Sequence, residues 1–278
     1  MSVAVRALDH FTVVPVVVGD TIVSDMILDT GIGLTVVSRA LCERLGCVVE
    51  GEHTGRRMSG QRIVVPLTRI SALSVAGRRS EDVQVGVVAG EGLLPPGIDG
   101  ILSLGMFAQT AFTLDPQAGV LVLEDASSLA RRAAEGTSVP VEVERDGASV
   151  SLFTWMALPG GASARVEIDT GSNVLILDER YMSRLGVDPT DPAVEVVRGE
   201  DETGHGYVRH FAAIAGAVHL VGAPESRQDR PRVMFQKIIH EGLVGREFLG
   251  RFAVTFDLPR SRIILGPRAS VGRPPTRP

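Results

Sequence analysis

The sequence predicts an all-β protein built from two homologous lobes, each of which carries one short helix. Two observations lead to this prediction: an internal repeat with a nearly constant offset, and a succession of short apolar segments rich in β-branched residues in each copy. The chain has 278 residues, of which 44% are hydrophobic and 22% charged. That length suffices for two domains whose cores require neither disulfides nor metals.

The internal repeat is clearest at two Asp-Thr-Gly triplets, each of which follows an apolar run. Asp29-Thr30-Gly31 recurs 140 residues later as Asp169-Thr170-Gly171. A later segment, Gly100–Leu102, recurs as Gly242–Val244 at an offset of 142. An offset that stays almost constant over so long a stretch indicates two copies of one domain rather than two chance motifs.

The first copy reads as a series of strands with one helix. Apolar runs predict strands over Phe11–Val18, Ile22–Leu28, Leu34–Val37, Arg62–Leu67, Ile70–Val75 and Val83–Val88. The dipeptide Gly19-Asp20 predicts a two-residue hairpin turn, and Gly77–Asp82 a longer hairpin loop. The helix should begin after Ser38, a residue type that caps helices, and end at Gly46.

The second copy repeats this order with a few additions. Strands are expected over Val139–Val143, Val150–Leu158, Val174–Leu177, Tyr207–Ala213, Ala217–Val221 and Val233–Ile238. Asp178 and Gly186 are the expected ends of its helix, and Gly222–Arg232 is expected to be an expanded polar loop. The only tryptophan, Trp155, is expected to anchor the core of this copy.

The repeat also predicts the domain boundaries. We expect an N-terminal lobe over residues 1–123, a linker over 124–137, a C-terminal lobe over 138–267 and a frayed tail over 268–278. Within the linker, Ser128–Ala134 is compatible with one or two helical turns.

Several functional classes find no support in the sequence. The net charge is −5, so no overall basic character favours nucleic acid as a partner. Cys42, on the expected helix, and Cys47 read as reduced thiols, and no spacing of cysteines or histidines predicts a metal or a cofactor. The sequence contains neither a Gly-x-Ser-x-Gly nor a phosphate-binding loop motif.

The N-terminus shows no pattern typical of a secretory signal, and its apolar run over Phe11–Val18 is too short to span a membrane. A cytoplasmic location and no membrane partner are therefore the expectations.

The paired triplets make the sequence resemble the retropepsin-like family of aspartic proteases. The resemblance rests on Leu28–Gly31 and Ile168–Ser172, supported by Asp99–Leu102 and Gly242–Gly245, and covers about residues 11–123 and 138–266. It implies two small β-barrel lobes that pack as a pseudo-dimer within one chain, as in the pepsin-like arrangement. It also implies an aspartic endopeptidase that acts as a monomer on a peptide or protein substrate, without metal or cofactor.

The resemblance assigns catalysis jointly to Asp29 and Asp169. Two carboxyls about 3 Å apart cannot both ionise readily, so they share a proton and one acts as base while the other acts as acid, as is known of aspartic-protease dyads. Gly31 and Gly171 would allow the backbone to approach the carboxylates closely. Thr30 and Thr170 would hydrogen-bond across the lobe interface.

The two carboxyls are also expected to be inequivalent. The hydroxyl of Ser172 could hydrogen-bond Asp169, whereas Ile32, at the matching position, cannot do this for Asp29. Asp169 is then the more readily ionised of the two. We expect Ser172→Ala to move the acid limb of the pH–rate profile.

Two glycine-flanked polar segments are candidates for flaps that close over the substrate. The first, Gly55–Gln61, contains Met58, Ser59 and Gly60. The second, Glu202–Tyr207, contains His205 and Tyr207. Neither matches the family pattern cleanly, and Ser103 stands where that pattern has a glycine.

Three alternatives remain open at the level of sequence. The chain could be a peptide-binding module that keeps a protease-like fold with little or no hydrolysis. It could be an enzyme that requires dimerisation of two chains, or one that requires removal of a segment. Intact aspartates in both triplets favour the single-chain enzyme.

Overall fold

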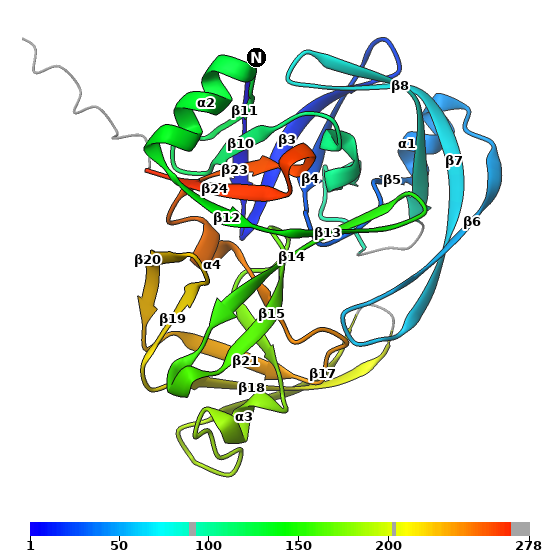
Figure 1. Cartoon of the computed structure of the whole chain (residues 1–278). Coiled ribbons are helices and arrows are strands. Elements are labelled where there is room, and N and C mark those ends of the chain that lie inside the picture. The colour runs from blue at the N-terminus through cyan, green and yellow to red at the C-terminus, as the bar shows by residue number, and fades with distance from the viewer. Residues whose placement is uncertain (89–92, 202–203, 268–278) are drawn as a thin grey trace, which may run out of the picture.

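The computed structural model describes residues 1–267 except 89–92 and 202–203, and it consists mainly of β-strands arranged in two lobes (Figure 1). The all-β, two-lobed fold expected from the sequence is confirmed. Two large sheets form the lobes, and a third sheet joins them. No helix in the described ranges is long and apolar enough to cross a membrane.

The N-terminal lobe is a strongly bent eight-stranded sheet. Its strands are β2 (Arg6–Leu8), β3 (Phe11–Val18), β4 (Ile22–Leu28), β5 (Val36–Ser38), β6 (Val49–Arg56), β7 (Arg62–Val75), β8 (Arg78–Val88) and β9 (Gly100–Leu102). They run in the order β2-β3-β4-β9-β5-β8-β7-β6, and an additional β3–β7 pairing folds the sheet back on itself. Valine and leucine side chains fill the space inside this bend, which gives the lobe its core.

The helix of this lobe, α1 (Arg39–Leu45), has the predicted ends. The Ser38 hydroxyl accepts the Leu41 N–H at 3.0 Å, and Gly46 closes the helix with a left-handed φ of 67°. Both cysteines are free, and Cys42 lies buried on this helix as expected. After β9 comes a single turn of 3-10 helix, η1 (Leu104–Phe107).

Three local predictions for this lobe were wrong. One strand, β7, spans the two predicted strands Arg62–Leu67 and Ile70–Val75, because Thr68 and Arg69 between them bond to Val48 and Asp82. The expected loop Gly77–Asp82 is mostly strand, and the turn is the pair Ala76-Gly77, both with positive φ. The turn after β3 has three residues rather than two.

The C-terminal lobe repeats the pairing pattern with more strands. These are β13 (Glu142–Asp146), β14 (Ser149–Ala157), β15 (Ser163–Ile168), β16 (Leu175–Asp178), β17 (Glu195–Glu200), β18 (Gly206–Ala213), β19 (Ala217–Leu220), β20 (Ala223–Asp229), β21 (Arg232–Gln236) and β22 (Gly242–Val244). Its short helical segments are η2 (Pro159–Gly161), α3 (Tyr181–Arg184) and α4 (Arg246–Leu249). Strand β22 lies parallel to β15 and antiparallel to β16, as β9 lies to β4 and β5.

Three predictions for the C-terminal lobe were also wrong. Asp178 does not cap α3; it ends β16 and accepts the N–H groups of Arg180 and Ile238. The expected loop Gly222–Arg232 contains β20, which pairs with β19. Trp155 is 43% exposed, because alternation along β14 turns its neighbours inward and directs the indole outward, where it donates to Glu142.

A six-stranded sheet joins the lobes. It contains β1 (Ser2–Ala4), β10 (Phe112–Asp115), β11 (Val120–Leu123), β12 (Thr137–Pro140), β23 (Ala253–Asp257) and β24 (Arg262–Gly266). At its centre β10 pairs antiparallel with β23, so that Thr113 opposes Thr255 with 2.7 Å between their hydroxyl oxygens. Phe112 stacks on Phe256 beside them, at 4.7 Å between ring centroids. The two lobes therefore share a packed and hydrogen-bonded sheet.

The connection between the halves contains a longer helix than expected, α2 (Ala126–Glu135), which covers one side of this sheet (Figure 1). Asp125 and Ser128 form a capping box at its start. A short turn, η3 (Leu258–Arg260), joins β23 to β24. The domain boundaries stay a prediction, and the tail 268–278 lies outside the described residues.

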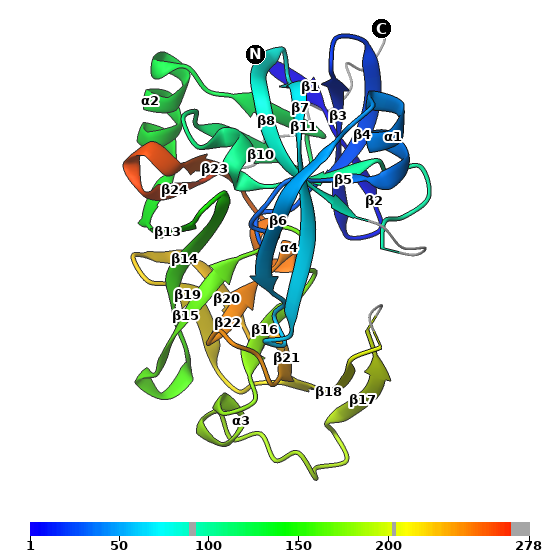
Figure 2. The same ribbon diagram turned by 90° about the vertical axis from the view of Figure 1, so that its right-hand side faces the viewer.

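Seen from the side, the long β6–β7 hairpin descends from the N-terminal lobe toward β16 and β21 of the C-terminal lobe (Figure 2). The hairpin of β17 and β18 extends outward from the opposite lobe. These two hairpins contain the segments expected to be flaps.

Candidate active site

Asp29 and Asp169 occupy matching places in the two lobes. Each directly follows a buried strand, β4 or β15, and each backbone N–H is bound by the parallel strand behind it. The Asp29 N–H donates to the Leu102 carbonyl at 3.0 Å, and the Asp169 N–H donates to the Val244 carbonyl at 3.1 Å. The segments threading behind the triplets thus fix the start of both loops.

The two threonines hold the loops to one another. The Thr30 N–H donates to the Thr170 hydroxyl at 3.1 Å, and the Thr170 N–H donates to the Thr30 hydroxyl at 3.0 Å. Each hydroxyl in turn donates to the opposite lobe: Thr30 to the carbonyl of Ile168, and Thr170 to that of Leu28. The expected bonds across the lobe interface are therefore present, and both side chains are buried.

Glycine is required in both triplets because each one lies against the opposite aspartate. A Cβ atom on Gly31 would stand 2.7 Å from Cγ of Asp169, and one on Gly171 would overlap the carboxyl of Asp29. Each glycine N–H also donates to the aspartate of its own loop at 2.8 Å. The loops can therefore bring the carboxyls together only without side chains at these positions.

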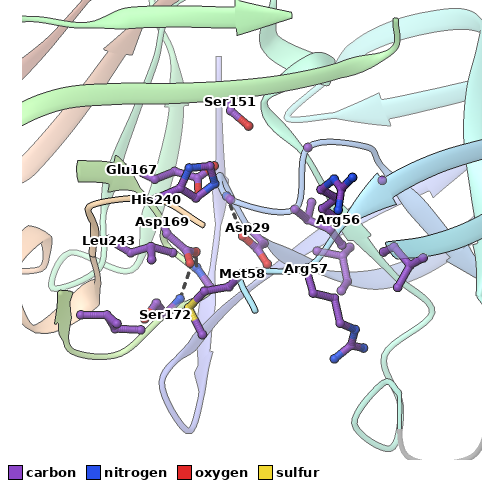
Figure 3. Close-up of a pocket in the computed structure, with 18 of the residues that line it drawn as sticks. Asp29, Arg56, Arg57, Met58, Ser151, Glu167, Asp169, Ser172, His240 and Leu243 are labelled. Atoms are coloured by element: carbon purple, nitrogen blue, oxygen red, sulfur yellow. Dashed lines mark hydrogen bonds and ion pairs between the residues drawn. The ribbon is translucent and has the colours of Figure 1, made fainter. Parts of the chain in front are cut away.

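The Asp29 and Asp169 side chains lie together at the cleft (Figure 3), each against the glycine of the opposite loop. Burial raises the pKa of Asp29 above its ordinary value. Burial likewise raises the pKa of Asp169 well above its ordinary value, and the negative charges of Asp29 and Glu167 raise it further. Two carboxyls this close titrate as a pair rather than independently.

The expected ordering of the two carboxyls stays a prediction. Ser172 reaches Asp169 through its backbone N–H, at 3.1 Å to Oδ1, and the backbone N–H of Ile32 makes a matching contact with Asp29. The two loops thus stabilise their carboxylates in the same way. On the side of Asp169, the negative charge of Glu167 also raises the pKa of the carboxyl.

Both aspartates open into a cleft of about 740 Å³ between the lobes. Its walls include Gly31, Ser172 and Met58 together with residues of both lobes. In the close-up, the side chains of Asp29 and Asp169 lie together, with Met58 beside them (Figure 3).

The first predicted flap reaches across this cleft. Met58 packs on an apolar cluster of the C-terminal lobe that includes Ile176 and Leu243, and its carbonyl accepts the Ile239 N–H at 3.0 Å. Gly60 forms the adjoining turn with a φ of 86°. Ser59 faces a smaller pocket outside the cleft.

The second predicted flap lies to the side of the cleft. His205 and Tyr207 line that smaller pocket, and neither borders the main cleft. Asp201, at the end of this hairpin, forms an ion pair with Arg57 of the first flap at 3.2 Å. Glu202 and Thr203 lie outside the described residues. Of the predicted flap residues, Met58 is the one that the structure places in the cleft.

Three polar residues beside the aspartates were not predicted from the sequence: Ser151, Glu167 and His240. All three line the cleft. The Glu167 side chain is 6% exposed, hydrogen-bonds Ser151, and lies 3.6 Å from Nε2 of His240. Comparing the two copies residue by residue would have found them, because the first copy has apolar residues at the matching positions.

The remaining departure from the family pattern is accommodated locally. Ser103 hydrogen-bonds the Thr35 hydroxyl at 3.1 Å and accepts the Gly105 N–H, which caps η1. It therefore leaves the loop of Asp29 in place. In the described part of the chain, no cluster of three or more His, Cys, Asp or Glu residues is arranged to hold a metal ion.

Comparisons with known proteins agree with this geometry. The aspartyl protease family profile matches residues 14–106, which run from β3 through Asp29 to η1. Comparison with curated protein sequences gives no match. Conglutin gamma, a basic 7S globulin from lupine seeds, has 12% sequence identity and a TM-score of 0.56, with 96% of this chain and 94% of that chain covered.

A basic 7S globulin from soybean is similar to the same extent: 12% identity, a TM-score of 0.57, and 95% of each chain covered. At these identities the likeness concerns the fold alone. The chain is therefore all-β and two-lobed, and residues 14–106 of its N-terminal lobe match the aspartyl protease family profile.

Proposed function

We propose that this protein is an aspartic endopeptidase with Asp29 and Asp169 as its catalytic pair. Within the aspartic proteases, we propose that it belongs to the retropepsin-like family. The observation that carries the proposal is the close approach of the two carboxyls at the cleft, held by reciprocal threonine bonds and by glycines that admit no side chain.

The chemistry follows from the shared proton. With one proton on the pair, the ionised carboxyl takes a proton from an attacking water while the protonated carboxyl donates to the carbonyl oxygen of the scissile bond. Collapse of the resulting tetrahedral intermediate requires a proton on the leaving nitrogen, which the pair can also supply. No covalent bond forms between the enzyme and the peptide.

The architecture also supports a peptide or protein substrate. An elongated peptide fits a cleft bounded by both lobes and crossed by the β6–β7 hairpin, and its backbone can bond to the strands that line it. Both aspartates come from one chain, so a monomer holds the complete pair.

Substitution of either aspartate tests this function. We expect Asp29→Asn and Asp169→Asn each to reduce kcat/KM for peptide cleavage by about 10³-fold or more, because neither variant can carry one proton on a carboxyl pair. The measurement is mass-spectrometric detection of cleavage in a peptide library. Asp25→Asn, on the same strand as Asp29 and partly exposed, is the matched control and should cleave at the wild-type rate.

Equal cleavage by all four proteins would exclude the aspartate mechanism. If the wild type instead retains peptides from the library without cutting them, the peptide-binding module is the correct description.

A further inference from the structure

The two sides of the catalytic pair carry different chemistry on matching backbone. We call Phe11, Ile27 and Ile98 the apolar corner, which lies in the N-terminal lobe and packs as one hydrophobic cluster. We call Ser151, Glu167 and His240 the polar corner, which lies in the C-terminal lobe and lines the cleft.

Strand pairing establishes that these positions correspond. Ile27 lies two residues before Asp29 and opposes Ile101 of β9, and Glu167 lies two residues before Asp169 and opposes Leu243 of β22. On the neighbouring strand, Val13 faces Ile27 as Phe153 faces Glu167, which makes Phe11 the counterpart of Ser151. Ile98 and His240 each precede the glycine of the threading strand by two residues.

Replacement of all three apolar residues by polar ones in one corner is hard to reconcile with packing alone. A buried carboxylate costs several kcal/mol unless a cation or several hydrogen bonds compensate it. Elsewhere in the fold this compensation is present: buried Glu124 pairs with Arg132 at 3.1 Å, and buried Asp257 pairs with Arg262 at 2.9 Å.

Glu167 has no such partner. Within the described ranges its ion-pair partner is His240, at 3.6 Å, and burial lowers the pKa of that imidazole so that it is neutral at pH 7. Arg165, whose charge acts on Glu167, is bound to Glu142 at 2.7 Å and to Glu144 at 2.5 Å on β13. The polar corner thus presents a buried carboxyl to the cleft without a fixed positive charge.

The groups that face Glu167 make its surroundings negative. Asp29, Asp169 and Glu144 are acidic and Arg165 opposes them, while the wider cleft wall also contains Arg56, Arg57 and Arg209. Glu167 precedes Asp169 by two residues on the same strand, a spacing of roughly 7 Å. An extended substrate has the same repeat, so its residue next to the scissile bond can direct a side chain to this corner.

We propose that the polar corner is a subsite for a basic side chain, lysine or arginine, at a substrate residue that flanks the scissile bond. Glu167 would accept the cation, while Ser151 and His240 hold its carboxyl in place. This inference rests on the proposed endopeptidase activity and specifies its substrate class.

Binding of a cation here should depend on pH. Burial and the neighbouring charges of Asp29 and Glu144 raise the pKa of Glu167 to about 7, with Arg165 opposing them. The carboxyl is therefore partly protonated at neutral pH and ionises when a cation binds. Affinity for a basic side chain should rise as the pH increases through 7, with Asp169 and His240 as the other titrating groups in contact.

Cleavage selectivity tests the subsite. The substrates are peptides released from a bacterial proteome by cleavage after glutamate, which retain internal lysine and arginine. Wild-type sites should carry Lys or Arg at one flanking position. A matched peptide pair with Lys or Gln there should differ by about tenfold or more in kcat/KM. Glu167→Gln should bring this ratio to within about twofold of unity, whereas Asp146→Asn, which removes an exposed carboxylate at the end of β13, should preserve it.

A binding measurement separates failure of the subsite from failure of the enzyme. The probes are butylguanidinium and its neutral analogue butylurea, titrated by NMR at pH 8 into wild type and Glu167→Gln. The wild type should bind the cation at least about tenfold more tightly, and the variant should bind both alike. If the wild type cuts no peptide but shows this difference, the subsite stands and the proposed activity fails. Cleavage with the same Lys/Gln ratio in wild type and Glu167→Gln would overturn the subsite and leave the activity.

Discussion

The apolar and polar corners show how two matching lobes can differ where they meet the substrate. Around the aspartates the two lobes are nearly identical. Each lobe contributes a threonine that hydrogen-bonds the opposite lobe, and each holds its own aspartate with a threading strand. Two residues earlier on the strand, one lobe has buried Ile27 and the other has buried Glu167.

This difference separates positions where the contact between the lobes limits the residue type from positions where each lobe can vary on its own. The two loops lie in contact, so a change in one must fit the other, as the glycines demonstrate. The corners face different surroundings, an apolar cluster on one side and the cleft on the other, and are free to diverge. A substrate preference that comes from the polar corner is the expected result of such divergence.

The largest expected effect comes from placing the acidic residue in the wrong corner. Ile27→Glu would bury a carboxyl among Val13, Phe11 and Ile98 without a partner, and should reduce the free energy of unfolding at pH 8 by roughly 5 kcal/mol. The loss should shrink toward pH 5 as the carboxyl protonates. Urea unfolding measures both values, with Ile27→Val as the control for lost volume. A variant as stable as the control at pH 8 would show that the corners do not differ as described.

Removing either of the two threonine side chains that bond across the lobes should give the next largest loss of stability. Thr30→Val and Thr170→Val each remove two buried hydrogen bonds, so each should lower the free energy of unfolding by roughly 4 kcal/mol, and by similar amounts. The double variant should lose less than the sum, because the bonds are reciprocal. Serine at either position should restore most of the stability. Strictly additive losses, read from urea unfolding, would argue against reciprocal bonding.

In the polar corner, removing a buried carboxylate should stabilise the protein, whereas adding one to the apolar corner destabilises it. Because the pKa of Glu167 is raised from 4.5 to about 7, wild-type stability falls relative to Glu167→Gln as the pH rises from 4.5 through 7. The variant should therefore be more stable by up to about 3 kcal/mol at pH 8 and nearly equal to the wild type at pH 4.5. Thermal or urea unfolding at the two pH values measures this. A difference that does not change with pH would mean that Glu167 is not protonated on burial.

The smallest effect concerns the two hairpins. Arg57 and Asp201 are partly buried, with side chains 23% and 16% exposed, so their coupling in a double-mutant cycle with Arg57→Gln and Asp201→Asn should be about 1 kcal/mol. Loss of the pair should also loosen the β6–β7 hairpin and raise the rate of substrate release. Zero coupling in urea unfolding would indicate that the hairpins do not hold each other.

The sequence predicted the fold and the aspartate contact because both depend on local signals that repeat. Apolar β-branched runs predicted most strands, and the doubled Asp-Thr-Gly predicted that Asp29 and Asp169 would meet. The errors arose where tertiary contacts decide. Arg69 continues a strand because Asp82 lies opposite, and Trp155 is exposed because of the register of β14.

The polar corner was overlooked for a different reason. Glu167 stands inside an apolar strand, and its orientation toward the cleft depends on the pairing of β14, β15 and β22. His240 comes from a segment far away in the sequence. Only the fold brings these residues together, although their contrast with Ile27 and Ile98 was already visible in the repeat.

The central claim is that Asp29 and Asp169 form one protonated pair, and titration of their carboxyl carbons by NMR in protein labelled with ¹³C-aspartate tests it most directly. We expect both resonances to shift in the same two titration steps, and the upper step to lie well above the ordinary aspartate pKa. In Asp29→Asn and Asp169→Asn the remaining resonance should titrate in a single step. Two independent single steps near 3.8 in the wild type would contradict the account.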